Sequence, residues 1–136
     1  MPPFTNENAV REKFQLDDAF LIPGALITRS IADAHAEILL LLAPHAPADP
    51  PDDLLVLGET LLAGAHLMRS LAAKDAAHQK EIAIGGHRIG PARRFAALMQ
   101  YSAETENAAW NALAPFLRRP PVRTPAAATD TQPVLG

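Results

Sequence analysis

Histidines and carboxylates are the side chains in this sequence that could hold a metal ion. Asp75 and His78 are three residues apart, so they would be neighbours on one face of a helix. One pair of ligands is not a site, because di-metal sites in helical bundles take carboxylates and Glu-x-x-His pairs from several helices. Neither Glu37 nor Glu59 has a histidine three residues later. We therefore expect no metal site and no cofactor. Three further histidines are interpreted as helix-surface, core or linker residues: His35, His66 and His45.

Nucleophilic catalysis has no recognisable pattern in the sequence. None of Ser30, Ser70 and Ser102 lies in a Gly-x-Ser-x-Gly turn, and Ser70 precedes Lys74 by four residues where the Ser-x-x-Lys pattern needs three. No glycine-rich loop ends in Gly-Lys-Ser/Thr. The absence of cysteine excludes a thiol nucleophile, a disulfide scaffold and a thiolate metal site. We predict that the chain is not an enzyme and has no catalytic residues.

A basic segment could contact DNA or an acidic protein surface. Its candidate residues are Arg88, Arg93 and Arg94, close to Lys80. The chain as a whole is acidic, with a net charge of −3, whereas nucleic-acid-binding domains usually present a strongly basic surface. A small helical nucleic-acid-binding or DNA-packaging accessory protein is therefore the alternative function.

The composition predicts the all-α class. With 136 residues the chain fits one domain, and 49% hydrophobic residues with only 5% aromatic residues favour close helix packing. We expect an N-terminal arm over 1–15, with a short helical turn from Val10 to Phe14. A helical domain over 16–117 and an extended Pro/Ala-rich tail over 118–136 follow.

Proline positions and apolar spacing predict a small bundle of three main helices. The helices are expected over about 22–43, 51–78 and 91–117, with a restart in the third where Ser102 could cap a new helix. Gly58 and Gly64 would let another helix approach the second one closely. Trp110 is interpreted as a core anchor, and a surface anchor for a partner is the alternative.

The segment 81–90 changes from helical to alternating periodicity and has Gly85-Gly86 at its centre. This pattern predicts either a short β-hairpin or a plain glycine loop. The tail that begins at Arg118 has many prolines and few apolar groups, so we expect it either to become ordered on a partner or to be a disordered end with no role.

Charge is distributed unevenly along the chain. Residues 1–68 carry ten acidic and three basic side chains, whereas residues 69–136 carry five acidic and nine basic ones. This polarity favours either an internal pairing of the two halves or a contact between the acidic half of one subunit and the basic half of another. The N-terminus has no basic-then-apolar pattern and the run 38–43 is short, so we expect no export signal and no membrane span.

Four sequence segments, in this order, carry a family resemblance. They are Ile-Ala-Asp-Ala-His-Ala-Glu-Ile (31–38), Leu-Ala-Gly-Ala-His-Leu-Met (62–68), Glu-Ile-Ala-Ile-Gly-Gly-His-Arg-Ile-Gly (81–90) and Trp-Asn-Ala-Leu-Ala-Pro-Phe-Leu (110–117). Over about 16–117 the chain resembles the small head-tail connector, or adaptor, proteins of tailed bacteriophages and gene transfer particles. The proline-rich link and Trp110 are not part of that family pattern.

The resemblance implies a structural virion protein and no catalysis. Such a protein forms a homo-oligomeric ring, commonly of twelve copies, below the portal protein. The ring extends the channel for double-stranded DNA without sequence-specific binding and contacts the stopper or tail protein. The resemblance also implies location in the virion at the head-tail interface, after assembly in the host cytoplasm, and no membrane partner. Its C-terminal extension would bind the portal, which makes these residues candidates for that contact: Arg118, Arg119, Arg123, Val134 and Leu135.

Overall fold

The computed structural model describes residues 1–16, 22–78, 82–84, 87–89 and 91–118. The chain is helical, as the composition predicts. The described elements are, in order, α1 (Glu7–Phe14), α2 (Gly24–Leu41), α3 (Asp53–His78), β1 (Ile82–Ile84), β2 (His87–Ile89), α4 (Pro91–Leu113) and the 3₁₀ turn η1 (Ala114–Phe116).

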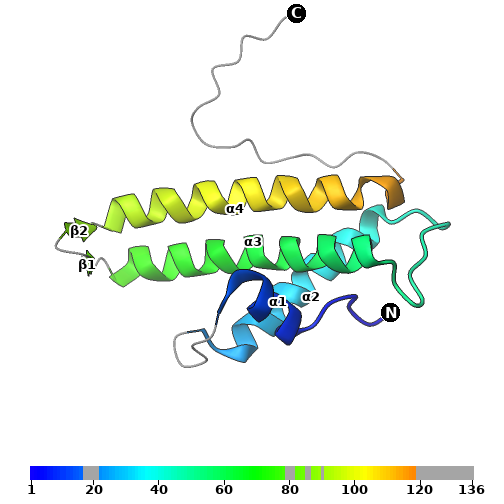
Figure 1. Ribbon diagram of the computed structural model, residues 1–136, viewed down its shortest axis with the longest axis horizontal. Helices are drawn as coiled ribbons and strands as arrows, with labels where there is room; N and C mark the ends of the chain where they lie inside the picture. Colours follow the sequence, from blue (N-terminus) through cyan, green and yellow to red (C-terminus); the bar gives the residue numbers. More distant parts are fainter. Residues whose placement is uncertain (17–21, 79–81, 85–86, 90, 119–136) are drawn as a thin grey trace, which may run out of the picture.

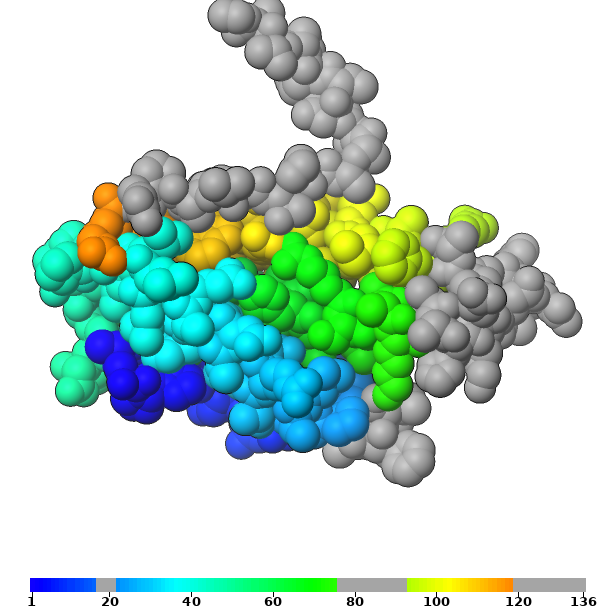
Figure 2. Space-filling view, turned by 180° about the vertical axis from the view of Figure 1, so that it is seen from behind, coloured from blue at the N-terminus to red at the C-terminus, as the bar shows by residue number. Residues whose placement is uncertain are grey.

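Helix α3 lies at the centre of the molecule. Figure 1 shows α3 and α4 side by side and antiparallel, with β1 and β2 at the end where they are joined. Strands β1 and β2 pair antiparallel with Ile82 opposite Ile89, and Gly85 and Gly86 between them lie outside the described residues. Helix α2 crosses the back of α3, as Figure 2 shows, and α1 contacts both α2 and α3.

The central position of α3 explains its apolar sequence. Its window Asp53–Asp75 has a mean hydropathy of 1.3, so by length and composition alone this helix could cross a membrane. In the folded chain 56% of that window is buried by the other helices. A helix that is packed by neighbours on several sides needs apolar residues around most of its circumference.

Helix α3 begins at a side-chain cap. The Asp52 carboxylate accepts a hydrogen bond of 2.8 Å from the backbone N–H of Leu54. Asp53 adds a negative charge in the first turn, where the partial positive charge of the helix N-terminus favours it. Helix α3 therefore begins at Asp53, two residues after the start near residue 51 that the sequence predicted.

Two glycines of α3 are sites of close helix contact, as the sequence predicted. A Cβ atom on Gly58 would lie 2.4 Å from Cγ of Leu113 in α4. A Cβ atom on Gly64 would lie 2.2 Å from the ring of Phe14 in α1. Any side chain at these positions would overlap the neighbouring element.

The predicted restart of the third helix at Ser102 is wrong. Helix α4 is continuous from Pro91 to Leu113. The Ser102 hydroxyl donates a 2.8 Å hydrogen bond to the carbonyl oxygen of Ala65 in α3 and is fully buried. A serine that links two helices does not need to cap a new one. Trp110, which is 3% exposed, belongs to the core as expected.

The ends of α2 and α4 are held together by backbone hydrogen bonds. Ala43 N–H donates to the Phe116 carbonyl (2.8 Å) and Arg118 N–H donates to the Leu41 carbonyl (2.7 Å). Leu42 and Leu117 form an isolated antiparallel bridge. This pairing ends α2 at Leu41 and α4 at Leu113, a few residues before the predicted ends.

The first fifteen residues are more than the arm that the sequence predicted. Phe4, Thr5 and Val10 are buried, and Phe4 and Val10 belong to the hydrophobic core. Helix α1 starts at Glu7 and is capped by Asn6, whose side chain accepts a hydrogen bond from Ala9 N–H (2.9 Å). The sequence predicted an arm because this segment is polar. In the structure, the backbone N–H groups of Phe4 and Thr5 donate hydrogen bonds to Glu59 of α3.

Replacing Gly58 with alanine should destabilise the protein. In an exposed helix position the same change would stabilise by up to about 1 kcal/mol. Here the added methyl group overlaps Leu113, which is fully buried, and overpacking costs about 1–3 kcal/mol. The free energy of unfolding from urea titration measures the effect. Ser70→Ala, at an exposed position of the same helix, is the matched control, and an equal effect of both changes would contradict the close contact.

Candidate functional site

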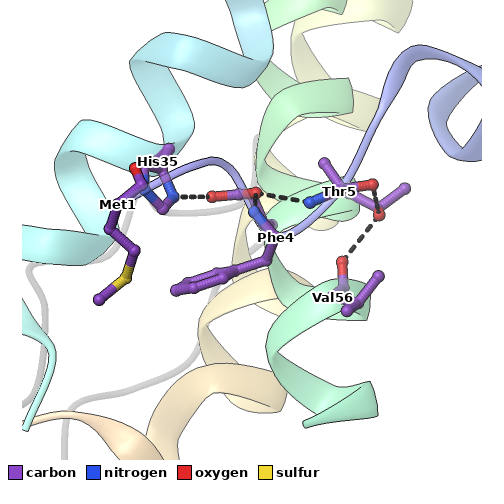
Figure 3. A network of polar contacts seen from close by, with 7 residues as sticks. Met1, Phe4, Thr5, His35 and Val56 are labelled. Carbon is purple, nitrogen blue, oxygen red and sulfur yellow. Dashed lines mark hydrogen bonds and ion pairs between the residues drawn. The ribbon is translucent and has the colours of Figure 1, made fainter. Parts of the chain in front are cut away.

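A buried carboxylate in the middle of α3 lies at the centre of a cluster of polar groups in the described interior. Glu59 has no exposed surface. Its Oε2 accepts hydrogen bonds from the backbone N–H groups of Phe4 (2.5 Å) and Thr5 (2.8 Å). Its Oε1 lies 2.5 Å from Nδ1 of His35, which comes from α2. Figure 3 shows Phe4, Thr5 and His35 gathered at this point.

The hydrogen-bond partners of His35 determine where its protons lie. The Nε2 atom is 3.1 Å from the Met1 carbonyl oxygen, which can only accept, so Nε2 carries a hydrogen. At 2.5 Å, Nδ1 and Oε1 of Glu59 must also share a proton, because two lone pairs would otherwise face each other. With the shared proton on either the histidine or the carboxyl group, the His35–Glu59 pair carries no net charge. A neutral pair is the form that a site without solvent tolerates best.

Burial raises the pKa of Glu59 above its ordinary value of 4.5. The hydrogen bonds from Thr5, His35 and Phe4 and the charge of His35 act in the opposite direction and do not cancel the effect of burial. The site can therefore retain a proton at a pH where an exposed glutamate has lost it.

The cluster fastens the N-terminal segment to two helices. The Thr5 and Thr60 hydroxyl oxygens are 2.6 Å apart, and Thr60 also donates to the Val56 carbonyl (2.7 Å), so Thr5 donates to Thr60. The Phe4 ring meets the His35 ring edge-on, with centroids 4.8 Å apart. We call these contacts the N-terminal clasp, made by Met1, Phe4, Thr5, His35, Glu59 and Thr60.

A second histidine and carboxylate pair also joins α2 to α3. Nε2 of His66 lies 2.9 Å from Oε1 of Glu37, although the atoms are not aligned as a hydrogen bond. Among the described residues, no group of three or more histidine, aspartate and glutamate side chains is close enough to hold a metal ion. Of the predicted neighbour pair on α3, Asp75 binds Arg94, and the side chain of His78 lies outside the described residues.

The candidate DNA-contact residues have different surroundings. Arg93, in the first turn of α4, is exposed. Arg94 forms a bidentate pair with Asp75 of α3, with Nε–Oδ2 and Nη2–Oδ1 distances of 2.7 and 3.0 Å. Arg88 is in β2, and its side chain is not described. Arg94 is thus committed to a contact between α3 and α4, so the basic segment presents less free charge than the sequence suggested.

The candidate portal-contact residues lie mostly beyond the described chain. Arg118 is exposed, but its guanidinium donates to the Leu40 carbonyl at the end of α2 (2.8 Å). The other four, Arg119, Arg123, Val134 and Leu135, are outside the described residues.

A shallow apolar depression lies between α1, α3 and α4 and has a volume of about 160 Å³. We call it the apolar hollow. It is lined by Phe14, Leu16, Gly64, Leu67, Met68, Leu71, Leu98 and Tyr101. Phe95 and Tyr101 of α4 are 40% and 52% exposed, so large apolar groups stand on the surface of the same helix.

No protein-family model, no curated protein and no solved structure matches the chain.

The N-terminal clasp was not identified from the sequence, although one signal was present. Glu59 is a single carboxylate inside the long apolar run of α3. A charged residue at such a position is buried only with a partner. That rule would have singled out Glu59, but the identity of the partner, 24 residues away on another helix, depends on the fold.

Replacing Glu59 with glutamine should change how stability depends on pH. The glutamine oxygen can still accept from Phe4 and Thr5, and its amide can donate to Nδ1 of a neutral His35. Because the folded-state pKa of Glu59 is raised, its favourable contribution is complete below pH 4.5 and is lost as pH rises through the folded pKa.

The free energy of unfolding of the wild-type protein should therefore fall relative to that of Glu59→Gln as pH rises from about 4.5 to 8, by at most about 1.4 kcal/mol per pH unit. Urea titrations across this range measure the difference. Glu104→Gln, at an exposed position of α4, should track the wild type. Parallel pH profiles for wild type and Glu59→Gln would show that no proton is held at the clasp.

The two adjacent arginines of α4 should respond differently to glutamine substitution. Arg94→Gln removes a bidentate pair in which the arginine side chain is only 12% exposed, so we expect a loss of about 1 kcal/mol. Arg93→Gln, at an exposed position, should change stability by less than about 0.5 kcal/mol. Thermal or urea unfolding compares them, and equal effects would mean that the Asp75–Arg94 pair contributes nothing.

Proposed function

We propose that this chain is a structural virion protein, a head-tail adaptor that forms a ring below the portal, extends the DNA channel and links the capsid to the tail. The sequence resemblance suggests this role. The segments that carry it fall on α2 (31–38), α3 (62–68), the β1–β2 region (81–90) and the end of α4 with η1 (110–117). The role requires binding surfaces and no catalysis.

The observation that carries the proposal is the separation of charge along the molecule. Asp49, Asp52 and Asp53 cluster where α2 leads into α3, and Asp49 and Asp53 are exposed. Lys74, near the other end of α3, and Arg93, at the start of α4, are also exposed. At 1.5 Å per residue, Asp53 and Lys74 are about 31 Å apart along the helix.

Unlike ends are what a ring of identical subunits needs. In a closed ring each subunit contacts its two neighbours through two different surfaces. An acidic end and a basic end on one chain attract each other between copies, whereas two copies of the same end repel. The charge separation thus favours head-to-tail assembly over a two-fold dimer.

The remaining parts of the proposal concern partners and finer architecture. In the assembled particle, the three main helices form the bundle, segment 81–90 is a hairpin, and the tail 118–136 extends along the portal. The stopper or tail protein binds the opposite face. Double-stranded DNA passes through the channel without sequence-specific contacts, and acidic groups facing the channel would limit adhesion to phosphate.

Electron microscopy and mass photometry of the full chain test the proposal. We expect closed rings with a central channel, either for the protein alone at high concentration or after addition of the portal protein of the same particle. The ring fraction should fall as salt is raised from 50 to about 500 mM, because screening weakens contacts between opposite charges. A chain that stays monomeric both alone and with the portal would contradict the adaptor role.

A further inference from the structure

Residues 1–5 are held to the rest of the molecule by a small set of contacts. Residues 1–3 are exposed, whereas Phe4 and Thr5 are buried. Pro2 and Pro3 have no N–H, so Phe4 and Thr5 carry the peptide N–H groups with which this segment can reach an acceptor. Both N–H groups donate to Glu59, as Figure 3 shows. The hydrogen bonds described for the segment end on three side chains: His35, Glu59 and Thr60.

Helix α1, which follows this segment, has contacts of its own with the rest of the fold. Asn6 caps it, Val10 is fully buried in the core, and the Arg11 guanidinium donates to two backbone carbonyl groups outside the helix. Residues 1–5 contribute one apolar side chain to the core, that of Phe4. A segment with few buried contacts can open while its better-packed neighbours stay folded. The boundary between the segment that can open and the helix that stays lies at Asn6.

The proton that His35 and Glu59 share determines how many contacts the closed segment can keep. With this proton, Nε2 of His35 donates to the Met1 carbonyl (3.1 Å) while Nδ1 and Oε1 of Glu59 are bridged at 2.5 Å. Without it, a neutral imidazole has one N–H for two acceptors, so one of the two contacts is lost. Glu59 is then also a buried ion beside an uncharged histidine, which is unfavourable in the absence of solvent. Opening of residues 1–5 relieves both problems by letting water reach the carboxylate.

Other charged groups near the clasp have partners or contact solvent. The charge that acts on the pKa of Glu59 is that of His35. Met1 carries its α-amino group in the same residue as the carbonyl that faces His35. The charged side chains of the surrounding helices include the pairs Glu7–Arg11, Glu37–His66 and Arg69–Glu106 and the exposed residues Glu12, Lys13, Asp33 and Asp53. Pairing and solvent screening weaken their influence on the clasp.

We propose that residues 1–5 form a strap that stays closed over Glu59 while the His35–Glu59 pair holds its shared proton, and that opens as the pH rises and this proton leaves. In the open state Glu59 is hydrated and binds a proton less tightly than in the closed state. The closed state therefore holds one proton more than the open state, so rising pH favours opening. The four helices stay folded, and the Phe4 side chain becomes exposed. The device acts within one chain and does not depend on the proposed ring.

Amide hydrogen exchange of the full chain, measured by NMR, tests the strap. Protection factors, which are corrected for the intrinsic pH dependence of exchange, should fall for the Phe4 and Thr5 amides as pH rises from about 6 to 8, by up to about tenfold per pH unit for one released proton. At pH 8 both amides should be on the order of tenfold or more less protected than the amide of Ala63, a fully buried residue of α3. Protection of Phe4 and Thr5 that does not change with pH, or that equals the protection of Ala63, would overturn the proposal.

Glu59→Gln is the matched control, because its amide cannot lose a proton in this range. Protection of Phe4 and Thr5 in the variant should stay constant from about pH 6 to 8. The variant keeps the α-amino group of Met1 and the surface charges, so any effect of their titration appears in both proteins. A fall of the same size in the variant and the wild type would assign the pH dependence to another group and overturn the proposal.

The wild-type protein gives a second measurement that needs no variant. The chemical shift of the Glu59 carboxyl carbon follows the protonation of this side chain. It should change over the same pH range in which Phe4 and Thr5 lose protection, while the shifts of the core residues Ala63 and Leu113 change little. A Glu59 transition without a loss of protection at Phe4 and Thr5 would show that the segment stays closed over the ionised carboxylate, which would overturn the strap.

Discussion

A carboxylate without access to solvent, placed in the middle of the most central helix, determines much of what must surround α3. Glu59 is fully buried, so its oxygens need donors and its charge needs a proton or a cation. Two backbone N–H groups of the N-terminal segment and one imidazole of α2 meet both needs. Through this one side chain, residues that are more than fifty positions apart become parts of the same core.

Polar contacts on another side of α3 hold α4 in register. Ser102 binds the Ala65 carbonyl, and Arg69 pairs with Glu106, whose carboxylate also approaches Nε1 of Trp110. Such contacts have fixed geometry, whereas apolar packing alone tolerates sliding. Close approach at Gly58 adds a steric constraint, since Leu113 of α4 occupies the space of the missing side chain. The long antiparallel pair is therefore specified by hydrogen bonds and by shape together.

The same architecture separates the charges that bear on assembly. The acidic link between α2 and α3 lies at the start of the central helix, and exposed Lys74 lies near its end. A long helix with an acidic end and a basic end gives the subunit two different surfaces. Two different surfaces let identical subunits join head to tail. The ion pairs Asp75–Arg94 and Arg69–Glu106 each lie within the sequence half from 69 onward, so neither of them joins the acidic half to the basic half. The acidic N-terminal half is thus not neutralised by these pairs.

The sequence by itself determined the features that depend on neighbouring residues: the helical class, the prolines at helix ends, the two glycines at close contacts and the burial of Trp110. Local periodicity and backbone preference act over a few residues, so they can be read along the chain. Tertiary structure decided the partners of Glu59, the role of Ser102 within an unbroken α4 and the engagement of Arg94 by Asp75. It also decided that the polar first residues join the core, because Phe4 and Thr5 find their partner 55 and 54 positions away. The physical reason is that a buried polar group pairs with whichever donor or acceptor the packing brings within 3 Å. The spacing of residues along the sequence does not show which group that will be.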